Sequence, residues 1–396
     1  MLKFLIVLVL GIPLFLHSIV SATPFIIGIV NDSLDGTQAD GHTMILWNPS
    51  IGLSDNVTDV IGLSGNSGAS NIFMIDCDLL SNGCSVGINV SLKVINNGDD
   101  YVTTIVNETI NGEGFQIAEN IQLNSPLSIT SIYVDDSFSS PSYEVDLSAG
   151  ETTAVTCQGV VRDYDGENDT LSVYGEFFDT ISSAFGNLDD NNDHYTNSSC
   201  FLNHSYGNIN ETQFICNYYV TYYASSNSWN CTVKGADYLI NHSASNTTFI
   251  NPLMAIELPS TIDYGLLDTS VMSNESVVNI TNKGNVVVNL TLEGYAVSRG
   301  DNLSMNCSDG MNISVNFQKY NLTSSNSGTM TLAQAEQVYT NLSSILTGKT
   351  FNLNYRHYDP APYIDDTNAT FWRIYVPDTV SLTSCSGKLI IGATRT

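Results

Sequence analysis

Short apolar runs with strand-like composition recur along almost the whole chain, and this spacing most constrains the fold. Runs rich in Val, Ile, Thr and Tyr alternate with clusters of Asn, Gly, Asp and Ser about every eight to twelve residues. Apolar residues at helical spacing occur in one stretch, Thr331–Leu346. The pattern predicts an all-β protein built from tandem β-sandwich domains.

The first 22 residues have the features of a secretory signal peptide. Lys3 provides a basic start, Phe4–Val20 is largely apolar, and Val20–Ala22 provides small residues for cleavage before Thr23. A transmembrane anchor is the alternative, because the run is long enough to span a bilayer, although Pro13 argues against it. We expect export, with no membrane anchor in the mature chain.

The charge balance excludes several classes of partner. The chain has 40 acidic and 12 basic residues and a formal net charge of −28, although only 13% of its residues are charged. A chain so poor in Lys and Arg repels phosphate, so we expect no binding to nucleic acid or anionic lipid. The hydrophobic content of 42% predicts a folded chain.

Composition shifts near two prolines divide the mature chain into three predicted domains. We place them at residues 23–124, 125–250 and 251–396, with Pro126 and Pro252 close to the boundaries. The eight cysteines are an even number, which in an exported chain predicts disulfides. A zinc site is disfavoured because the sequence has no Cys-x-x-Cys pair.

Two cysteines of the second domain lie in strand-like segments far apart in sequence. Cys157 lies in Ala154–Val160, and Cys231 lies in Trp229–Val233. This arrangement resembles the bridge between the two sheets of an immunoglobulin-like domain, although no Trp lies in the strand after Cys157. The resemblance implies a Cys157–Cys231 disulfide.

The remaining cysteines are paired by their position in the chain. Cys200 and Cys216 are left to pair within the second domain, and Cys307 and Cys385 would join distant strands of the third. Cys77 and Cys84 are close enough to close one local loop, with two free thiols as the alternative.

Several segments resemble known exported proteins. Phe25–Val30 and Thr43–Trp47, with the turn between them, resemble the start of transthyretin-like or carboxypeptidase-regulatory-like modules. Val160–Gly166, Asp189–Cys200 and Gly294–Cys307 resemble exported proteins of small-genome archaea that carry tandem immunoglobulin-like domains without an assigned activity. The resemblance implies a cell-surface role and supplies no catalytic residue.

Acceptor sequences for N-glycosylation are abundant. Twenty Asn-x-Ser/Thr sequences occur, about twice as many as the composition alone predicts. An Asn-rich composition is the alternative explanation. The predicted glycosylation sites of the third domain are Asn274, Asn279, Asn289, Asn302, Asn312, Asn321, Asn341 and Asn368.

Two acidic runs could bind calcium. In the first run, the carboxylates of Asp163, Asp165 and Asp169 alternate around a glycine, and such oxygen ligands suit Ca²⁺. A second, similar run spans Asp189–Asp193. A solvated turn is the alternative for the first run.

A tyrosine cluster follows Cys216. If Cys216 faces the core, alternation places Tyr218 and Tyr222 inside, and Tyr219 and Tyr223 outside. We expect the outward pair to pack against a neighbouring strand or loop, and a contact with a sugar or a protein is the alternative.

The sequence contains no recognisable catalytic motif. The histidines, His194 among them, are isolated from one another, and Gly62–Gly65 falls short of a Gly-x-Ser-x-Gly motif. Two carboxylates brought together by folding could still form a glycosidase site. We expect Lys93 at the surface; the alternative is a buried lysine that forms an amide bond with an asparagine.

We therefore expect an exported, N-glycosylated cell-surface protein with a structural or interaction role and no catalytic activity. The alternatives are a carbohydrate-binding adhesin and a secreted, glycosidase-like hydrolase. The expected partners are other envelope proteins or further copies of the chain, through strand addition at Phe25–Val30. No cofactor other than calcium is expected.

Overall fold

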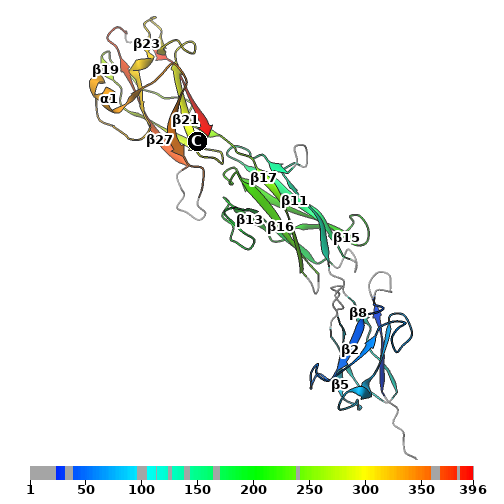
Figure 1. Ribbon diagram of the computed structural model, residues 1–396. Coiled ribbons are helices and arrows are strands. Elements are labelled where there is room, and N and C mark those ends of the chain that lie inside the picture. The colour runs from blue at the N-terminus through cyan, green and yellow to red at the C-terminus, as the bar shows by residue number, and fades with distance from the viewer. Residues whose placement is uncertain are drawn as a thin grey trace, which may run out of the picture. The chain divides into compact units, whose positions relative to one another are not determined.

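The computed structural model describes residues 24–31, 39–95, 105–112, 114–123, 127–137, 143–163, 170–237, 241–357, 366–380 and 384–395. The predicted signal peptide lies outside these ranges. Almost every element within them is a strand, which confirms the all-β fold (Figure 1). The chain forms two compact units, Met1–Pro126 with Asp163–Gly166, and Leu127–Arg162 with Glu167–Thr396. None of the described helices is long and apolar enough to cross a membrane.

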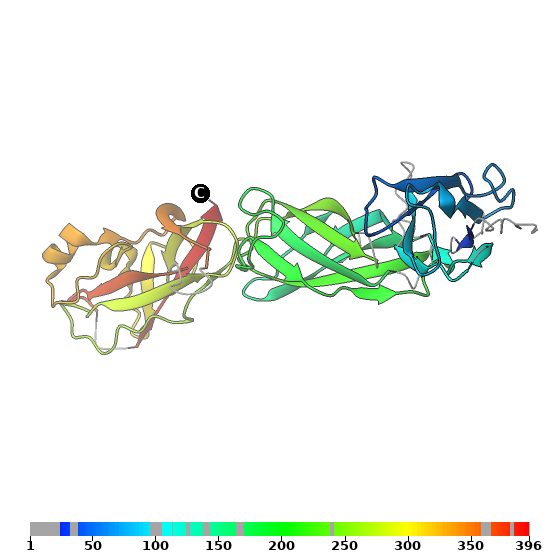
Figure 2. The same ribbon diagram turned by 90° about the horizontal axis from the view of Figure 1, so that it is seen from below.

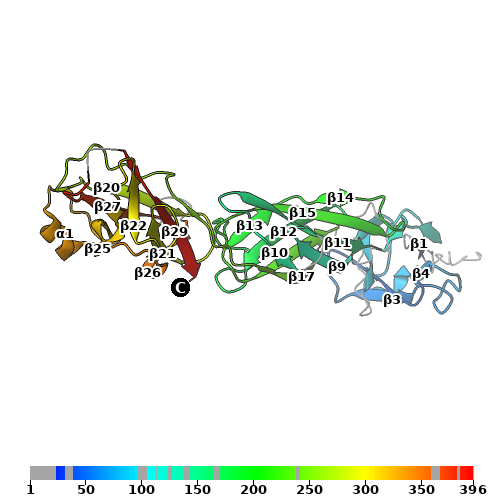
Figure 3. The same cartoon turned by 90° about the horizontal axis from the view of Figure 1, so that it is seen from above.

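The first unit contains one β-sandwich. Its elements are β1 (Phe25–Asn31), β2 (Thr43–Trp47), β3 (Asn56–Val60), β4 (Ile72–Asp76), the 3-10 turn η1 (Cys77–Leu79), β5 (Asn89–Ile95), β6 (Val106–Thr109), β7 (Phe115–Ile117) and β8 (Ile121–Gln122). One sheet has the order β4-β1-β7, with β8 also paired to β1, and the other has the order β3-β2-β5-β6 (Figures 1 and 3). Ile26 and Phe73 of the first sheet and Leu46 of the second belong to one buried core.

Strand β1 lies inside its sheet and has no free edge. It pairs antiparallel with β4 on one side and parallel with β7 and β8 on the other. The prediction that Phe25–Val30 accepts an added strand is therefore wrong, because strand addition needs unpaired backbone groups. Ile26 and Val30 are completely buried.

The second unit begins with a larger sandwich, whose long strands are green in Figure 2. Its strands are β9 (Ser128–Asp135), β10 (Glu144–Val145), β11 (Thr152–Arg162), β12 (Ser172–Asp179), β13 (His194–Asn197), β14 (Phe201–Asn203), β15 (Glu211–Thr221), β16 (Ser228–Ala236) and β17 (Asn241–Ile250). The sheet orders are β10-β17-β16-β12-β13 and β14-β15-β11-β9.

A disulfide joins these two sheets. It links Cys157 on β11 to Cys231 on β16, and Trp229 is completely buried in the same core. A loop of this length is worth about 4 kcal/mol in the chain-entropy description. The remaining disulfides are Cys77–Cys84, Cys200–Cys216 and Cys307–Cys385, so all four pairs are those the sequence predicts.

The third sandwich has a split sheet facing a continuous one. Its elements are β18 (Ile256–Glu257), β19 (Val271–Met272), β20 (Ser276–Asn282), β21 (Val288–Tyr295), β22 (Leu303–Cys307), β23 (Ile313–Ser314), η2 (Val315–Phe317), β24 (Gln318–Asn321), α1 (Leu332–Val338), β25 (Thr340–Asn341), β26 (Thr347–Leu353), β27 (Thr367–Val376), β28 (Cys385–Ser386) and β29 (Lys388–Arg395). The continuous sheet has the order β18-β20-β27-β24-β25, with β19 paired to β27. The split sheet has the orders β26-β21-β29 and β23-β22-β28.

Helix α1 is shorter than the sequence predicts. Thr331 and Gln334 form a capping box at its start. The helix ends at Val338, because Thr340 and Asn341 leave the helical path and pair with β24. Ala335 packs with Met272 in a small cluster on the outer face of the continuous sheet, so α1 covers that face.

Candidate interaction surface

The outer face of sheet β4-β1-β7 is largely apolar, and Asp76 of β4, which pairs with Phe25, is a charged residue on it. In register, Ile27 of β1 lies between Met74 of β4 and Ile117 of β7. Phe25 lies beside Phe115, with their ring centroids 5.4 Å apart. Directly paired residues project from the same face, so these side chains form one continuous apolar surface. We call it the β1 outer face.

Part of this surface is strongly exposed. Ile29, Phe115 and Ile117 have 41%, 70% and 79% of their surface exposed, and Ile27 and Met74 are half-buried. Apolar residues on both faces of a strand are typical of sheets that are covered on both sides. Here the sandwich core covers one face, and the other has the character of an interaction site.

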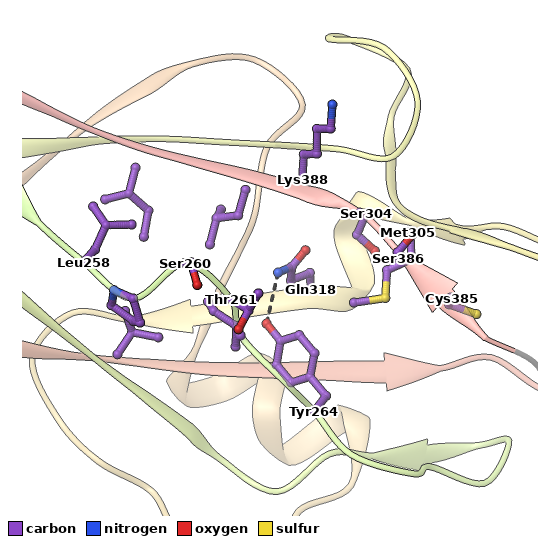
Figure 4. Close-up of a pocket in the computed structure, with 16 residues that line it drawn as sticks. Leu258, Ser260, Thr261, Tyr264, Ser304, Met305, Gln318, Cys385, Ser386 and Lys388 are labelled. Carbon is purple, nitrogen blue, oxygen red and sulfur yellow. Dashed lines mark hydrogen bonds between the residues drawn. The ribbon is translucent and has the colours of Figure 1, made fainter.

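A pocket of about 300 Å³ lies in the third sandwich, beside the segment that follows β18 (Figure 4). Gln318 Nε2 donates a hydrogen bond of 3.0 Å to the Tyr264 hydroxyl within it. Burial raises the pKa of Tyr264, so its hydroxyl stays neutral. Lys388 is the one charged residue among the described residues that line the pocket, and no carboxylate does. The described lining of this pocket lacks the carboxylate pair of a glycosidase.

The tyrosine prediction holds for two of its four members. Tyr218 is buried in the core, and Tyr219 is 71% exposed. Strand β15 ends at Thr221, so the alternation stops there. Tyr223 packs against the segment that follows β26, as expected: its ring stacks on that of His357 at a centroid distance of 4.0 Å.

The second acidic run lies against the third sandwich. Asp193 forms an ion pair with Arg356, and its carboxylate also accepts a hydrogen bond from the Ser225 hydroxyl. Asn192 accepts a hydrogen bond from the backbone N–H of His357 at 3.0 Å. The Arg356 guanidinium thus binds the Asp193 carboxylate, which the sequence suggests as a calcium ligand. These contacts hold the second and third sandwiches in one unit.

The first acidic run is only partly described. Asp163 is completely buried, whereas Asp165 and Asp169 lie outside the described residues. Among the residues that the structure describes, no group of three or more His, Cys, Asp or Glu side chains could hold a metal ion. Calcium binding at Asp163, Asp165 and Asp169 therefore stays a prediction.

A serine, a histidine and a glutamate meet in the second sandwich. Ser183 Oγ lies 2.9 Å from His194 Nδ1, and His194 Nε2 lies 3.3 Å from Glu176 Oε2. The imidazole is completely buried, and Phe178 stacks on it. A catalytic serine needs a cleft where a substrate carbonyl meets oxyanion donors. The buried His194 ring instead has a structural role: it links Ser183, in the turn after β12, to Glu176.

Most of the predicted glycan acceptors of the third domain are accessible. The exposed ones are Asn274, Asn279, Asn302, Asn312, Asn341 and Asn368. Asn289 and Asn321 are half-buried. Asn321 Nδ2, the atom that would carry a glycan, donates a hydrogen bond of 2.8 Å to the backbone oxygen of Val338. Lys93 is exposed, as expected.

No protein-family model matches the sequence, and no curated protein matches it either. Among solved structures, the major pilin subunit BcpA of Bacillus cereus is similar over 79% of this chain and 97% of its own, with 9% identity and a TM-score of 0.32. The major pilin SpaD of Corynebacterium diphtheriae is similar over 84% of this chain and 92% of its own, with 9% identity and a TM-score of 0.24. The first eight Ig domains of Down Syndrome Cell Adhesion Molecule give 10% identity, 76% and 39% coverage and a TM-score of 0.20. Similarity at this level establishes neither a family nor a function.

Replacing Arg356 should loosen the contact between the second and third sandwiches. Arg356→Ala leaves the buried Asp193 carboxylate without its cation, and we expect the unit to lose about 2–3 kcal/mol of unfolding free energy. Chemical denaturation measures the loss. Arg162→Ala removes a more exposed ion pair with Glu211 and should cost much less. Equal losses in the two variants would contradict this account of the contact.

The same contact should respond to pH. Burial lowers the pKa of His357 and Lys283 lowers it further, while Asp366 opposes both. The unfolded chain therefore binds more protons between the lowered pKa and the ordinary value of about 6.5, and stability falls as the pH drops through that window. We expect the difference in melting temperature between about pH 7.5 and about pH 5.5 to shrink in His357→Gln. If His357→Gln leaves this difference in melting temperature unchanged, another group causes the pH dependence.

Proposed function

We propose that this chain is an exported, N-glycosylated protein of an archaeal cell surface, with a structural or interaction role and no catalytic activity. The observation that carries the proposal is the β1 outer face, where apolar side chains of β1 and β7 remain exposed beside half-buried ones of β4. Four disulfides suit an oxidising, extracellular compartment. The partner is another envelope protein or a further copy of the chain.

Two features support docking through a sheet face rather than through an edge. The face presents large apolar side chains, including the aromatic Phe115, and such residues dominate binding energy in interfaces. Strand β1 is already hydrogen-bonded on both sides, so the contact depends on side chains. A partner with a complementary apolar patch would bury Ile29, Phe115 and Ile117.

Carbohydrate binding is the second candidate. Tyr219 is 71% exposed, and an open aromatic ring can stack on a sugar. The pocket beside Tyr264 offers hydroxyl and amide groups of the kind that hydrogen-bond neutral polar ligands. A glycan array with the wild-type chain and Tyr219→Ala distinguishes this candidate from protein docking.

The docking proposal predicts the effect of a double substitution. Phe115→Ser with Ile117→Ser should remove two apolar anchors and weaken association roughly tenfold or more, because each is worth about 1–2 kcal/mol. The envelope-to-medium ratio of the chain in its own cells and its sedimentation in solution measure the effect.

A matched control uses the third sandwich. Ile345→Ser replaces a side chain that is 72% exposed and lies outside the β1 outer face, so it should leave both measurements unchanged. If the double variant stays folded and is retained as well as the wild type, the β1 outer face is not the docking surface.

Calcium binding at Asp163, Asp165 and Asp169 is part of the proposal and has its own test. A ligand that binds the folded state raises the melting temperature, so EDTA should lower the melting temperature of a chain kept in calcium. Asp165→Ala should abolish this shift, whereas Asp189→Ala, in the second acidic run, should preserve it. Identical melting temperatures with and without EDTA would refute calcium binding.

A further inference from the structure

Three polar residues lie in one row across the continuous sheet of the third sandwich. Lys319 on β24 pairs with Arg373 on β27 and with Asn341 on β25. Directly paired residues project from the same face of a sheet, and here α1 covers that face. Lys319 and Arg373 are both completely buried. The row therefore places a lysine amine between a guanidinium and an amide, away from water.

The amine is held against the amide. Lys319 Nζ donates hydrogen bonds to Asn341 Oδ1 at 2.6 Å and to the backbone oxygen of Asn316 at 3.2 Å. The nearest carboxylate comes from α1, where Glu336 Oε1 lies 3.6 Å from Nζ. A nucleophile, an electrophilic carbonyl carbon and a proton acceptor are thus within reach of one another.

The surroundings favour a neutral amine. Burial lowers the pKa of Lys319, although Glu336 opposes this effect. Arg373 lies beside Lys319 in the sheet register, and a neighbouring guanidinium also disfavours the protonated form of the amine. A desolvated lysine beside another cation is an activated nucleophile.

We propose that Lys319 and Asn341 react to form an intramolecular isopeptide bond, with Glu336 as the proton carrier. The Nζ lone pair attacks Cγ of Asn341, and the carbonyl electrons move onto Oδ1. Glu336 takes a proton from Nζ and delivers it to Nδ2. The carbonyl then re-forms, the Cγ–Nδ2 bond breaks, and ammonia leaves. One amide replaces another, so the reaction needs no oxidant and no other reactant.

The exposure of the two acceptor residues suits this reaction. Asn341 is exposed, so released ammonia passes into solvent and is diluted away. The Glu336 side chain is 54% exposed and places a carboxylate oxygen 3.6 Å from Nζ, where it can accept a proton. The bond would tie β24 to β25, the strand that directly follows α1, and so fasten the helix to the sheet. Asn341 is also a glycan acceptor, and a glycan on its Nδ2 would exclude the cross-link.

Peptide mapping of the full exported chain tests the proposal. The chain is produced with its disulfides in a host without N-glycosylation, then reduced, alkylated and cleaved after Lys, Arg and Glu. Cleavage after Glu336 separates Lys319 from Asn341 in sequence. We expect the two pieces to stay joined, lighter by one ammonia and uncut after Lys319. Two separate pieces from the folded chain would overturn the proposal, including the case in which Asn341 alone has lost ammonia.

Variants assign the roles. Asn341→Ala should abolish the joined product, while Lys388→Gln, which removes an exposed lysine of the same sandwich, should leave it unchanged. Glu336→Gln keeps both reacting groups and changes only a half-exposed side chain, so it should fold and form the bond at least about a hundredfold more slowly. Joined product at the wild-type rate in Glu336→Gln would overturn the role of Glu336.

Discussion

Each sandwich is held together by the burial of one face of each sheet against its partner, and the rest of the molecule depends on what happens to the other face. The outer sheet faces of the three sandwiches differ in composition and in what covers them. In the first, the β1 outer face is apolar and exposed. In the second, strand β17, which lies between β10 and β16, is rich in Asn, Ser and Thr. In the third, α1 covers the continuous sheet and buries Lys319 and Arg373 beneath it. We propose that the first face docks a partner and that a covalent cross-link forms beneath α1 in the third sandwich.

Much of the fold could be predicted because it depends on local pattern. The strand Thr43–Trp47 has its predicted bounds. Three disulfides follow from position along the chain, and Cys157–Cys231 follows from the resemblance to an immunoglobulin-like domain. The run Phe25–Val30 illustrates where this reasoning stops. Its apolar composition predicts a strand with two apolar faces. It does not predict that this strand lies between two neighbouring strands. Whether a strand lies at the edge or in the centre of a sheet depends on the topology, which a local sequence pattern does not encode.

The same limit explains the sites that sequence reasoning missed. Lys319 and Asn341 are neighbours only because β24 and β25 pair, and no motif joins them in sequence. Lys93 lies in an equally strand-like segment and yet is exposed. Arg356 reaches Asp193 across more than a hundred and fifty residues, so the second acidic run gains a guanidinium partner that its own composition does not reveal. Long-range pairing, rather than residue type, determines these sites.

The central claim is that the β1 outer face contacts a partner on the cell. Photo-crosslinking tests it most directly: a photoreactive phenylalanine analogue replaces Ile117, at the β1 outer face, or Ile345, which is similarly exposed in the third sandwich. Intact cells are irradiated and the chain is recovered under denaturing conditions. We predict a discrete, higher-mass protein adduct from position 117 and none from position 345. No adduct from position 117, in a folded and surface-retained chain, would contradict the claim.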